Sequence, residues 1–219
     1  GEDLLTLLGF YLAEGSCSDR NGIRFSIGRS NLPLVSEMSE RLARVFGLQP
    51  TFHASASRAA ELKLVNRVAA VAWQHLFGFQ AAESHTKRIP DLVFNVAEPL
   101  RLAFLRGYLL GDGTTAAGRI AFATSSYDIA SGLMYLLSSL GVVASLSEIE
   151  PDGVEREIRG RPCVTRRTHW QITITAAEEL RKLEGVWSDH SSAASIRDRI
   201  AQTRPATNRR FEALDGDLM

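Results

Sequence analysis

Two segments of the chain share one pattern of apolar positions that ends in an acid followed by glycine. Residues 7–15 read LLGFYLAEG and residues 105–113 read LRGYLLGDG, and small residues recur four positions apart in each. Residues four apart lie on one face of an α-helix, so each segment predicts a helix with a strip almost free of side chains. A glycine inside a helix costs about 1 kcal/mol relative to alanine. Close approach of two helix backbones is therefore the expected reason for these strips.

The acids of the two segments are Glu14 and Asp112. They come together at one end of the helix pair if the two strips face each other. Two carboxylates at close range repel, and one of them must hold a proton unless a divalent cation lies between them. The pattern therefore predicts a metal site at the end of two paired helices.

The two halves of the chain remain similar after these helices. Alternating apolar and polar residues predict strands at 24–30 and 119–125, and helical patterns ended by glycine follow over 33–46 and 129–140. Two further strands are predicted in each half, at 51–55 and 61–65 and at 143–149 and 167–175. The nearly constant offset predicts a duplicated α+β fold.

The boundary between the two halves is expected near Pro90 and Pro99. We predict a first half of residues 1–92 and a second half of residues 93–219, with a junction at about 85–98. Pro99 then lies at the start of the second motif helix, where proline is favoured. Because the motif helices pair, we expect the halves to form one rigid body.

The predicted strands have one apolar and one polar face. Antiparallel sheets with one solvated face show this alternation by default. The polar positions here contain few acids and many residues that hydrogen-bond base edges and phosphates, which favours a sheet that contacts DNA. The positions predicted to contact DNA are Arg24, Ser26, Gly28, Arg29, Thr51, His53, Ser55, Glu61, Lys63, Arg119, Ala121, Ala123, Ser145, Ser147, Arg166, Arg167, His169, Gln171 and Thr173.

Composition changes this interpretation little. The chain has 219 residues, of which 45% are hydrophobic and 23% charged, and its formal net charge of zero argues mildly against a nucleic-acid partner. Residues 156–167 nevertheless contain five arginines and one acid, a locally basic run. Cys17 and Cys163 lack the spacing of a disulfide or zinc framework, and no apolar run is long enough for a membrane span. We expect a cytoplasmic, prokaryotic protein with no membrane partner.

LLGFYLAEG and LRGYLLGDG resemble the two signature helices of the LAGLIDADG homing endonucleases, in the single-chain form with two motifs. The resemblance implies an α+β fold of two pseudo-symmetric αββαββα halves, joined by the paired helices, with antiparallel sheets that form a saddle on double-stranded DNA. It implies a monomer without an obligate protein partner, which cuts both strands of a long pseudo-palindromic site by metal-dependent phosphodiester hydrolysis. The fourth strand of each sheet is not placed, since residues 54–60 are too small and polar to assign.

The resemblance also implies a set of site residues. The catalytic acids fall on Glu14 and Asp112, which would bind Mg²⁺, or Mn²⁺ or Ca²⁺ in its place, with the carbonyl groups of Ala13 and Gly111 as further ligands. Glu14 stands where Asp is more usual in the family. Lys87 precedes Arg-Ile-Pro and resembles the lysine of intein-lodged members, so it would polarise the attacking water or stabilise charge in the transition state.

The second half departs from this pattern. Its corresponding stretch, residues 195–200, contains Arg197 and Arg199 and no lysine. An arginine, Lys182 or no basic residue at all could serve the second acid, and a preferential nickase is one alternative. A maturase or regulator that binds DNA or RNA without cleavage is another, but both acids are retained. An unrelated α+β protein with ordinary helix C-caps is the third. The residue sequences of the motifs favour an intein-derived endonuclease.

Overall fold

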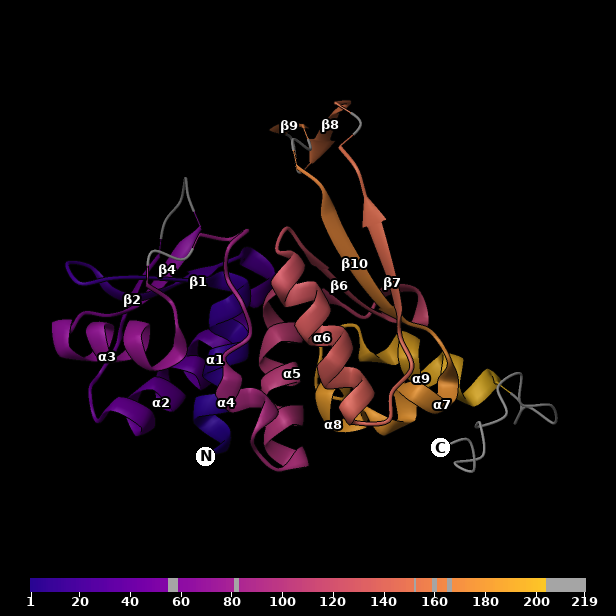
Figure 1. Ribbon diagram of the computed structural model, residues 1–219, viewed down its shortest axis with the longest axis horizontal. Coiled ribbons are helices and arrows are strands. Elements are labelled where there is room, and N and C mark those ends of the chain that lie inside the picture. The colour runs from indigo at the N-terminus through magenta and orange to yellow at the C-terminus, as the bar shows by residue number, and fades with distance from the viewer. Residues whose placement is uncertain (55–58, 81–82, 152, 159–160, 165–166, 204–219) are drawn as a thin grey trace, which may run out of the picture.

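Two helices lie side by side through the middle of the molecule, α1 (Glu2–Glu14) and α5 (Glu98–Asp112) (Figure 1). The computed structural model describes residues 1–54, 59–80, 83–151, 153–158, 161–164 and 167–203. Both helices end at the acid of their motif, as the sequence predicts. Each then leads directly into the first strand of a sheet, so the two acids lie where the helices meet the sheets.

The two halves of the chain repeat one order of elements. After α1, the first half continues with β1 (Gly15–Ser18), β2 (Gly22–Ile27), η1 (Arg29–Leu34), α2 (Val35–Phe46), β3 (Thr51–His53), β4 (Ala60–Leu64) and α3 (Arg67–Phe77). The short helix α4 (Asp91–Phe94) follows in the predicted junction. After α5, the second half continues with β5 (Gly113–Thr114), η2 (Ala116–Gly118), β6 (Ile120–Thr124), α6 (Tyr127–Ser139), β7 (Ser145–Ile149), β8 (Glu155–Ile158), β9 (Arg161–Val164), β10 (His169–Ile174), α7 (Ala177–Lys182), α8 (Glu184–Trp187) and α9 (Ala193–Gln202).

Each half contains an antiparallel four-stranded sheet with the same topology. The strand orders are β1-β2-β4-β3 and β5-β6-β10-β7. Equivalent apolar residues face each other in the central pairs, Phe25 opposite Leu62 and Phe122 opposite Ile172, and all four are buried. The predicted fold class, two αββαββα-like halves with antiparallel sheets, is confirmed. The exact division at residues 92 and 93 stays a prediction.

Two of the sheet strands and one hairpin were not predicted. The unplaced fourth strands are β1 and β5, which follow the motif acids directly and not residues 54–60. β1 reads GSCS and β5 contains two residues, so neither has an apolar alternation that a sequence pattern could detect. Backbone pairing with β2 and β6 holds them in the sheets, with Gly15 opposite Phe25 and Gly113 opposite Phe122.

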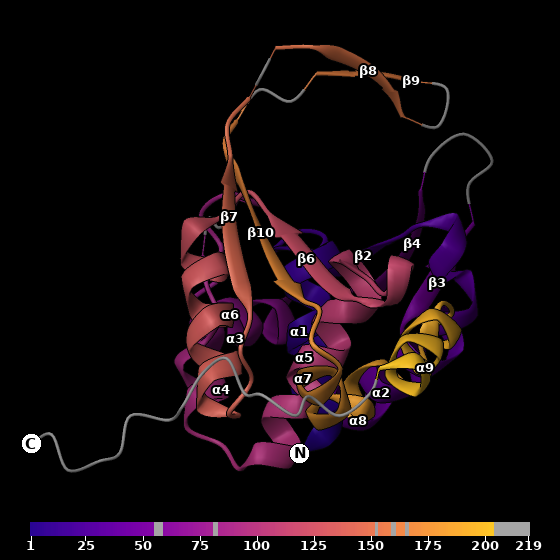
Figure 2. The same ribbon diagram turned by 90° about the vertical axis from the view of Figure 1, so that its right-hand side faces the viewer.

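The hairpin of β8 and β9 extends the second half. It is inserted between β7 and β10 and forms a separate two-stranded sheet. In Figures 1 and 2 it stands clear of the rest of the molecule, beyond the ends of β7 and β10 and above the other strands. The equivalent β3–β4 connection of the first half is much shorter, so the two halves differ most at this point.

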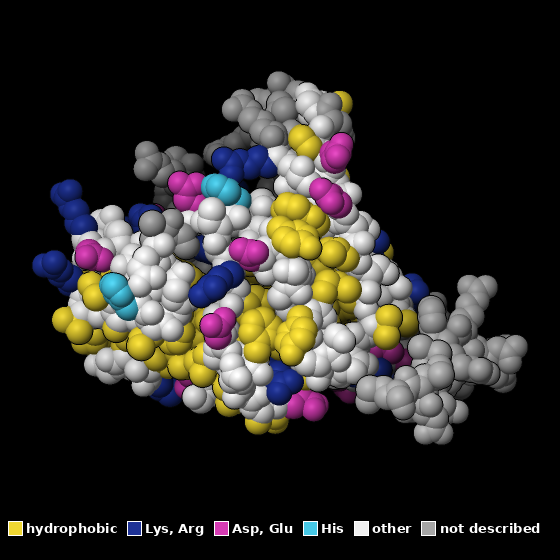
Figure 3. Space-filling view, in the orientation of Figure 1, with side chains coloured by type: hydrophobic (Ala, Val, Ile, Leu, Met, Phe, Trp, Pro, Cys, Tyr) yellow, Lys and Arg dark blue, Asp and Glu magenta, His cyan; other side chains and the backbone are white. Residues whose placement is uncertain are grey.

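Helix α6 has a buried face against the second sheet and an aromatic outer face. Figure 3 shows hydrophobic side chains gathered over this part of the molecule. Tyr127 and Tyr135 are exposed, and their rings contact Trp170 and Phe94 respectively. Of the helices in the described part of the chain, none combines the length and apolar composition that a membrane span requires.

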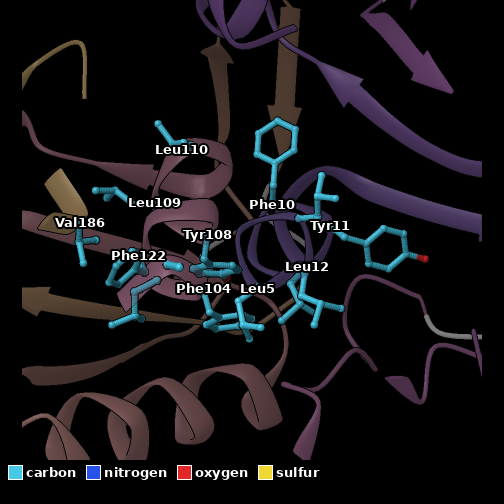
Figure 4. Packing of buried hydrophobic residues seen from close by; sticks show 14 of the residues in the cluster. Leu5, Phe10, Tyr11, Leu12, Phe104, Tyr108, Leu109, Leu110, Phe122 and Val186 are labelled. Carbon is cyan, nitrogen blue, oxygen red and sulfur yellow. The ribbon is translucent and has the colours of Figure 1, made fainter. Parts of the chain in front are cut away.

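Glycines at the seam of α1 and α5 allow the two backbones to touch. A Cβ atom on Gly9 would lie 2.0 Å from the Phe104 carbonyl oxygen, and one on Gly107 would lie 2.0 Å from the Thr6 carbonyl oxygen. Figure 4 shows the large apolar side chains that flank this contact, among them Phe10 and Tyr108. The predicted reason for the glycine strips, close helix approach, is therefore confirmed.

Candidate functional site

The two motif acids lie next to each other at the strand end of the helix seam. A Cβ atom on Gly111 would be 2.3 Å from the Ala13 Cβ and 3.3 Å from the Glu14 Cγ. The residue before Asp112 thus packs against the side chain of Glu14. The structure brings together the carboxylates that the sequence predicts to share a metal.

The surroundings of both carboxyls favour their neutral forms. Burial, together with the nearby Asp112 charge, raises the pKa of Glu14 to about 7. The Asp112 residue reaches the surface, yet protein atoms packed around its carboxyl reduce its hydration and raise its pKa to about 6. The Lys87 ammonium opposes both shifts. Two such carboxyls are poised to bind a cation, which would remove their mutual repulsion.

Lys87 is buried at the C-terminal end of α1 and is only 5% exposed. Its Nζ atom donates to three backbone carbonyl oxygens, those of Tyr11 at 3.0 Å, Leu12 at 3.1 Å and Gly15 at 2.7 Å. These bonds use all three N–H groups of the ammonium. Lys87 therefore caps the negative end of the helix, and it reaches the acids through its charge rather than through a hydrogen bond.

The charge of Lys87 acts on both halves of the site. Burial lowers its pKa to about 8, and the charges of Asp112 and then Glu14 oppose this shift. The sequence pairs Lys87 with Glu14, the acid of its own half. In the folded protein, Asp112 is the carboxylate that stabilises its charged form more strongly.

The basic candidates of the second half have other partners. Arg197 donates to the Ser188 carbonyl oxygen at 2.5 Å and Arg199 to that of Thr175 at 2.8 Å. Lys182 donates to the Gly141 carbonyl oxygen at 2.5 Å and forms an ion pair with Glu179 at 2.9 Å. These side chains hold loops and helix ends together, so the structure does not bring them to Asp112.

The donor set at the seam fits a hard divalent cation. Mg²⁺ typically takes one or two protein carboxylates and completes its shell with water and substrate phosphate oxygens. Helix ends also leave their last carbonyl groups without a partner in the next turn, as at Ala13 and Gly111. Among the described residues, no group of three or more His, Cys, Asp or Glu side chains forms a larger metal cage. Two carboxylates with backbone and solvent oxygens are thus suited to a metal that is shared with a phosphate.

The polar faces of both sheets are open to solvent at most predicted positions. Exposed residues are Ser26, Arg29, Thr51, His53, Arg119, Ala123, Ser145, Ser147 and Arg167. Half-buried residues are Arg24, Gly28, Glu61, Lys63, His169, Gln171 and Thr173. Ala121 is only 3% exposed, since it lies between its strand partners Thr114 of β5 and Thr173 of β10. Its contact with DNA stays a prediction. Ser55 and Arg166 lie outside the described residues.

Charges on the first sheet already form a local network. Glu61 forms ion pairs with Lys63 at 2.5 Å and with Arg24 at 3.8 Å, and its hydrogen bond to Lys63 keeps the pKa of Glu61 low. Arg24 also donates to the Ser16 hydroxyl at 3.2 Å. A phosphate at this face would compete with Glu61 for both cations, so this face can exchange an internal anion for an external one.

Hydrogen bonds of Ser126 that hold the backbone near Lys87 are not predicted by the sequence. The Ser126 hydroxyl donates to the Lys87 carbonyl oxygen at 2.6 Å, and the Ser126 amide donates to the Thr124 hydroxyl at 3.1 Å. A serine before a helical pattern signals an N-cap, but nothing in the sequence tells which distant carbonyl it also binds.

Comparison with known proteins identifies the family. Residues 99–187 match the LAGLIDADG-like domain family. This stretch of the chain is a LAGLIDADG-like domain. The match begins at α5 and ends in α8, and the first half repeats its topology. The resemblance inferred from the two motifs is confirmed.

Solved structures show the same fold over most of this chain. The crystal structure of I-DmoI in complex with DNA and Ca matches with a TM-score of 0.60 and 12% identity, over 90% of this chain and 97% of that one. Full-length DUF199/WhiA from Thermatoga maritima matches with a TM-score of 0.53 and 14% identity, over 94% of this chain and 62% of that one. At such identities the likeness establishes the fold alone.

Curated relatives are closer in sequence but much longer. A DNA polymerase of Thermococcus sp. (strain GE8) is 32% identical over 150 residues, which are 66% of this LAGLIDADG chain and 8% of the polymerase. The replication factor C small subunit of Methanocaldococcus jannaschii is 29% identical over 149 residues, 67% of this chain and 8% of that protein. The LAGLIDADG chain thus spans about 8% of the length of these relatives.

Proposed function

We propose that this LAGLIDADG protein is a metal-dependent, site-specific DNA endonuclease that cuts both strands of a long pseudo-palindromic target. The observation that carries the proposal is the pair of carboxyls, Glu14 and Asp112, held together where two glycine-lined helices meet two polar sheet faces. Burial raises the pKa of both carboxyls, and the nearby Asp112 charge adds to the rise at Glu14. A bound cation would stabilise their charged forms. Two carboxyls held together in a partly buried site contribute no stability of their own, so a functional role best accounts for them.

The residues of the site take distinct roles in this proposal. Glu14 and Asp112 hold Mg²⁺, with Mn²⁺ or Ca²⁺ as substitutes, and the Ala13 and Gly111 carbonyl groups add oxygen ligands. When bound, the metal supplies charge neutralisation on the scissile phosphate and activation of water. Lys87 fixes the end of α1 and offsets negative charge at both acids. Activity as a direct proton acceptor would first require it to release a carbonyl group of α1.

The sheets supply the DNA contacts. Two antiparallel sheets with solvated Arg, Lys, His, Gln, Ser and Thr residues can read base edges and contact phosphates along a duplex. The likeness to I-DmoI, crystallised with DNA and with Mn, Mg or Ca, supports this proposal and the use of a divalent ion. We infer that a single chain suffices, since both acids and both sheets are present in it.

An intein origin is supported by the proteins that contain similar segments. A DNA polymerase, a replication factor C subunit and an A-type ATP synthase subunit share no single activity, yet each contains a matching stretch. That stretch is 8%, 8% and 14% of their respective lengths. A segment that recurs in unrelated hosts is typical of an inserted element, so we propose that this endonuclease is intein-derived.

Unequal cutting of the two strands is the second candidate function. Glu14 is one methylene longer than Asp112, and Lys87 caps α1, while the basic residues of the second half bind elsewhere. The two halves of the site are therefore chemically different. The protein would act as a preferential nickase if this difference strongly slowed the cleavage of one DNA strand.

Selection from a randomised DNA duplex library tests the proposed function. The protein is incubated with the library and Mg²⁺, and cleaved ends are sequenced on both strands. We expect one long site to be enriched, with paired nicks on opposite strands. Bound but uncut DNA would contradict the endonuclease and favour a cleavage-deficient relative, while cuts on one strand alone would establish the nickase.

Substitution of Lys87 should reduce the cleavage rate more than the affinity for DNA. Lys87→Met removes the positive charge near both acids. By analogy with removal of one group that stabilises a transition state, we expect the cleavage rate to fall by up to about 100-fold. Three carbonyl groups of α1 also lose their donor, so the free energy of unfolding should fall by about 1–3 kcal/mol. Single-turnover cleavage at saturating DNA separates rate from affinity.

Lys182→Met is the matched control, because Lys182 also donates to a backbone carbonyl but is not part of the site. It should cleave like the natural protein. An unchanged rate with much weaker DNA binding in Lys87→Met would instead make Lys87 a phosphate contact.

Without metal, the free energy of unfolding should pass through a minimum near pH 7–8 as the pH is varied. The acids have folded pKa values of about 7 and about 6, above their ordinary 4.5 and 3.8, so the stability that they contribute declines as pH rises to about 7. Lys87 has a folded pKa of about 8, below 10.5, so its contribution is full above 10.5 and declines as pH falls to about 8. Thermal unfolding in a chelator, from pH 4 upward, would show the minimum.

A divalent cation should raise the melting temperature most at this minimum. A cation at a concentration of 100 times its dissociation constant adds about 2.7 kcal/mol to the free energy of unfolding. At pH 5 the acids are largely protonated and bind the cation weakly, so most of this gain should be absent. Glu14→Gln should flatten both effects. An equal rise with Mg²⁺ at pH 5 and pH 8 would contradict a metal held by these two acids.

A further inference from the structure

The buried hydroxyl of Ser126 connects the two halves of the protein at Lys87. Ser126 lies before α6 in the second half and is 1% exposed. Its hydroxyl oxygen accepts a hydrogen bond from the Ile129 amide at 3.2 Å, which caps α6. The same hydroxyl donates its proton to the Lys87 carbonyl oxygen at 2.6 Å. Only the first of these bonds is needed for the helix cap.

Lys87 is therefore held at both of its ends by different halves. Its ammonium is fixed by three carbonyl groups at the end of α1, and its own carbonyl is fixed by the Ser126 hydroxyl. The junction segment that contains Lys87 otherwise turns through local bonds, such as that from the Lys87 amide to the Glu83 carbonyl oxygen at 3.0 Å. The bond to Ser126 ties the backbone of Lys87 to a distant element.

The network continues from Ser126 into strand β6. Thr124 of β6 accepts a hydrogen bond from the Ser126 amide at 3.1 Å. Thr124 and Ser126 are both buried, at 9% and 1% exposure. A buried polar network is costly unless satisfied, and a satisfied one fixes a single geometry. The chain of contacts thus runs from β6 through Ser126 and Lys87 to the end of α1.

We propose that Ser126 is a positioning residue for cleavage, which holds Lys87 at the end of α1 beside the motif acids and makes its placement depend on the docking of both halves. The inference rests on the proposed endonuclease function. Loss of the hydroxyl leaves the Lys87 carbonyl without its donor and lets the junction segment shift. Displacement of a charged group by about 1 Å from a reacting centre costs about 100-fold in rate.

Ser126→Ala is the first test of this proposal. We expect cleavage at saturating DNA to slow about 10-fold to 100-fold, with DNA affinity little changed. Ser126→Thr keeps a hydroxyl and should restore most of the rate. Ser126→Gly largely preserves helix capping but removes the donor, so it should behave like Ser126→Ala even if the alanine variant folds poorly.

Asn66→Ala is the matched control for loss of a helix cap. The Asn66 side chain accepts a hydrogen bond from the Ala69 amide at 2.9 Å and caps α3, without contact to Lys87. It should lose similar stability and keep the cleavage rate. A loss of rate in Asn66→Ala equal to that in Ser126→Ala would overturn the proposal, since the effect would then be one of stability.

Acylation of lysine side chains gives a readout that does not depend on cleavage. The chain contains three lysines, Lys63, Lys87 and Lys182, so each can be followed by peptide mass spectrometry after treatment with acetic anhydride. Lys63 and Lys182 have side-chain exposures of 25% and 45% and serve as internal references. Lys87 should be strongly protected in the natural protein and several-fold more reactive in Ser126→Ala and Ser126→Gly.

The outcomes separate the proposal from the proposed function. Unchanged protection of Lys87 together with an unchanged cleavage rate in Ser126→Ala and Ser126→Gly would overturn the positioning role. If the natural protein cuts no DNA with Mg²⁺, the endonuclease proposal fails, and with it the catalytic purpose of Ser126. The acylation result would still report whether Ser126 holds Lys87 in place.

Discussion

Asp112→Asn is expected to bind target DNA and to cleave neither strand at a measurable rate. The substitution keeps the size and shape of the side chain but removes a negative charge and a metal ligand from the helix seam. Charge stabilisation by a bound metal is worth several kcal/mol, and about 1.4 kcal/mol is a tenfold change in rate. The expected loss is therefore about 1,000-fold or more in single-turnover cleavage with Mg²⁺.

Affinity for DNA should remain or rise slightly in Asp112→Asn, because a negative charge close to the scissile phosphate is removed. The pKa of Glu14 should fall toward its ordinary value, since Asp112 is one cause of its rise. Asp198→Asn, the same change on the exposed surface of α9, is the control and should leave cleavage intact. Undiminished cleavage by Asp112→Asn would contradict the assignment of Asp112 to the metal site.

Gly107→Ala is expected to destabilise the protein strongly. On helix propensity alone, alanine would stabilise α5 by about 1 kcal/mol. The added Cβ would lie 2.0 Å from the Thr6 carbonyl oxygen and 3.0 Å from the Phe10 amide nitrogen, and both are backbone atoms that cannot rotate away. The helices must separate, so we expect a loss of about 3 kcal/mol or more in the free energy of unfolding.

Cleavage should fall together with stability in Gly107→Ala, since separation of α1 and α5 also separates the two acids. Gly185→Ala in α8 is the control, because a Cβ there meets no atom within 4 Å. That variant should be as stable as the natural protein. Denaturant unfolding of both proteins measures the difference, and equal stability would show that the seam can expand without cost.

Several features of the fold could be predicted because their signals are local. The strands β2, β4, β6 and β10 have apolar residues at alternate positions that face the core, and the period of two is visible in the sequence. Gly47 and Gly141 follow α2 and α6 with φ of 66° and 67°, a conformation that glycine adopts without strain. Repetition of these signals at a fixed offset predicted the duplicated architecture.

Other features required the folded chain because their partners are distant. Ala121 stands at a polar-face position of the sequence pattern, yet it is only 3% exposed because β6 lies between β5 and β10. β1 and β5 exist through backbone pairing with β2 and β6, which no side-chain pattern announces. The hairpin of β8 and β9 reads in the sequence as a basic loop, and its strands pair only with each other.

The sequence by itself determined the paired glycine helices, the two acids and their shared need for a cation. These follow from residue types at helical spacing, and a helix fixes such spacing without help from the rest of the chain. Only the tertiary structure decided how Lys87 is used, since its three acceptors lie 72 to 76 residues away and Ser126 lies 39 away. Hydrogen bonds at such separations are selected by the packing of two whole halves, and that selection makes one lysine serve both acids.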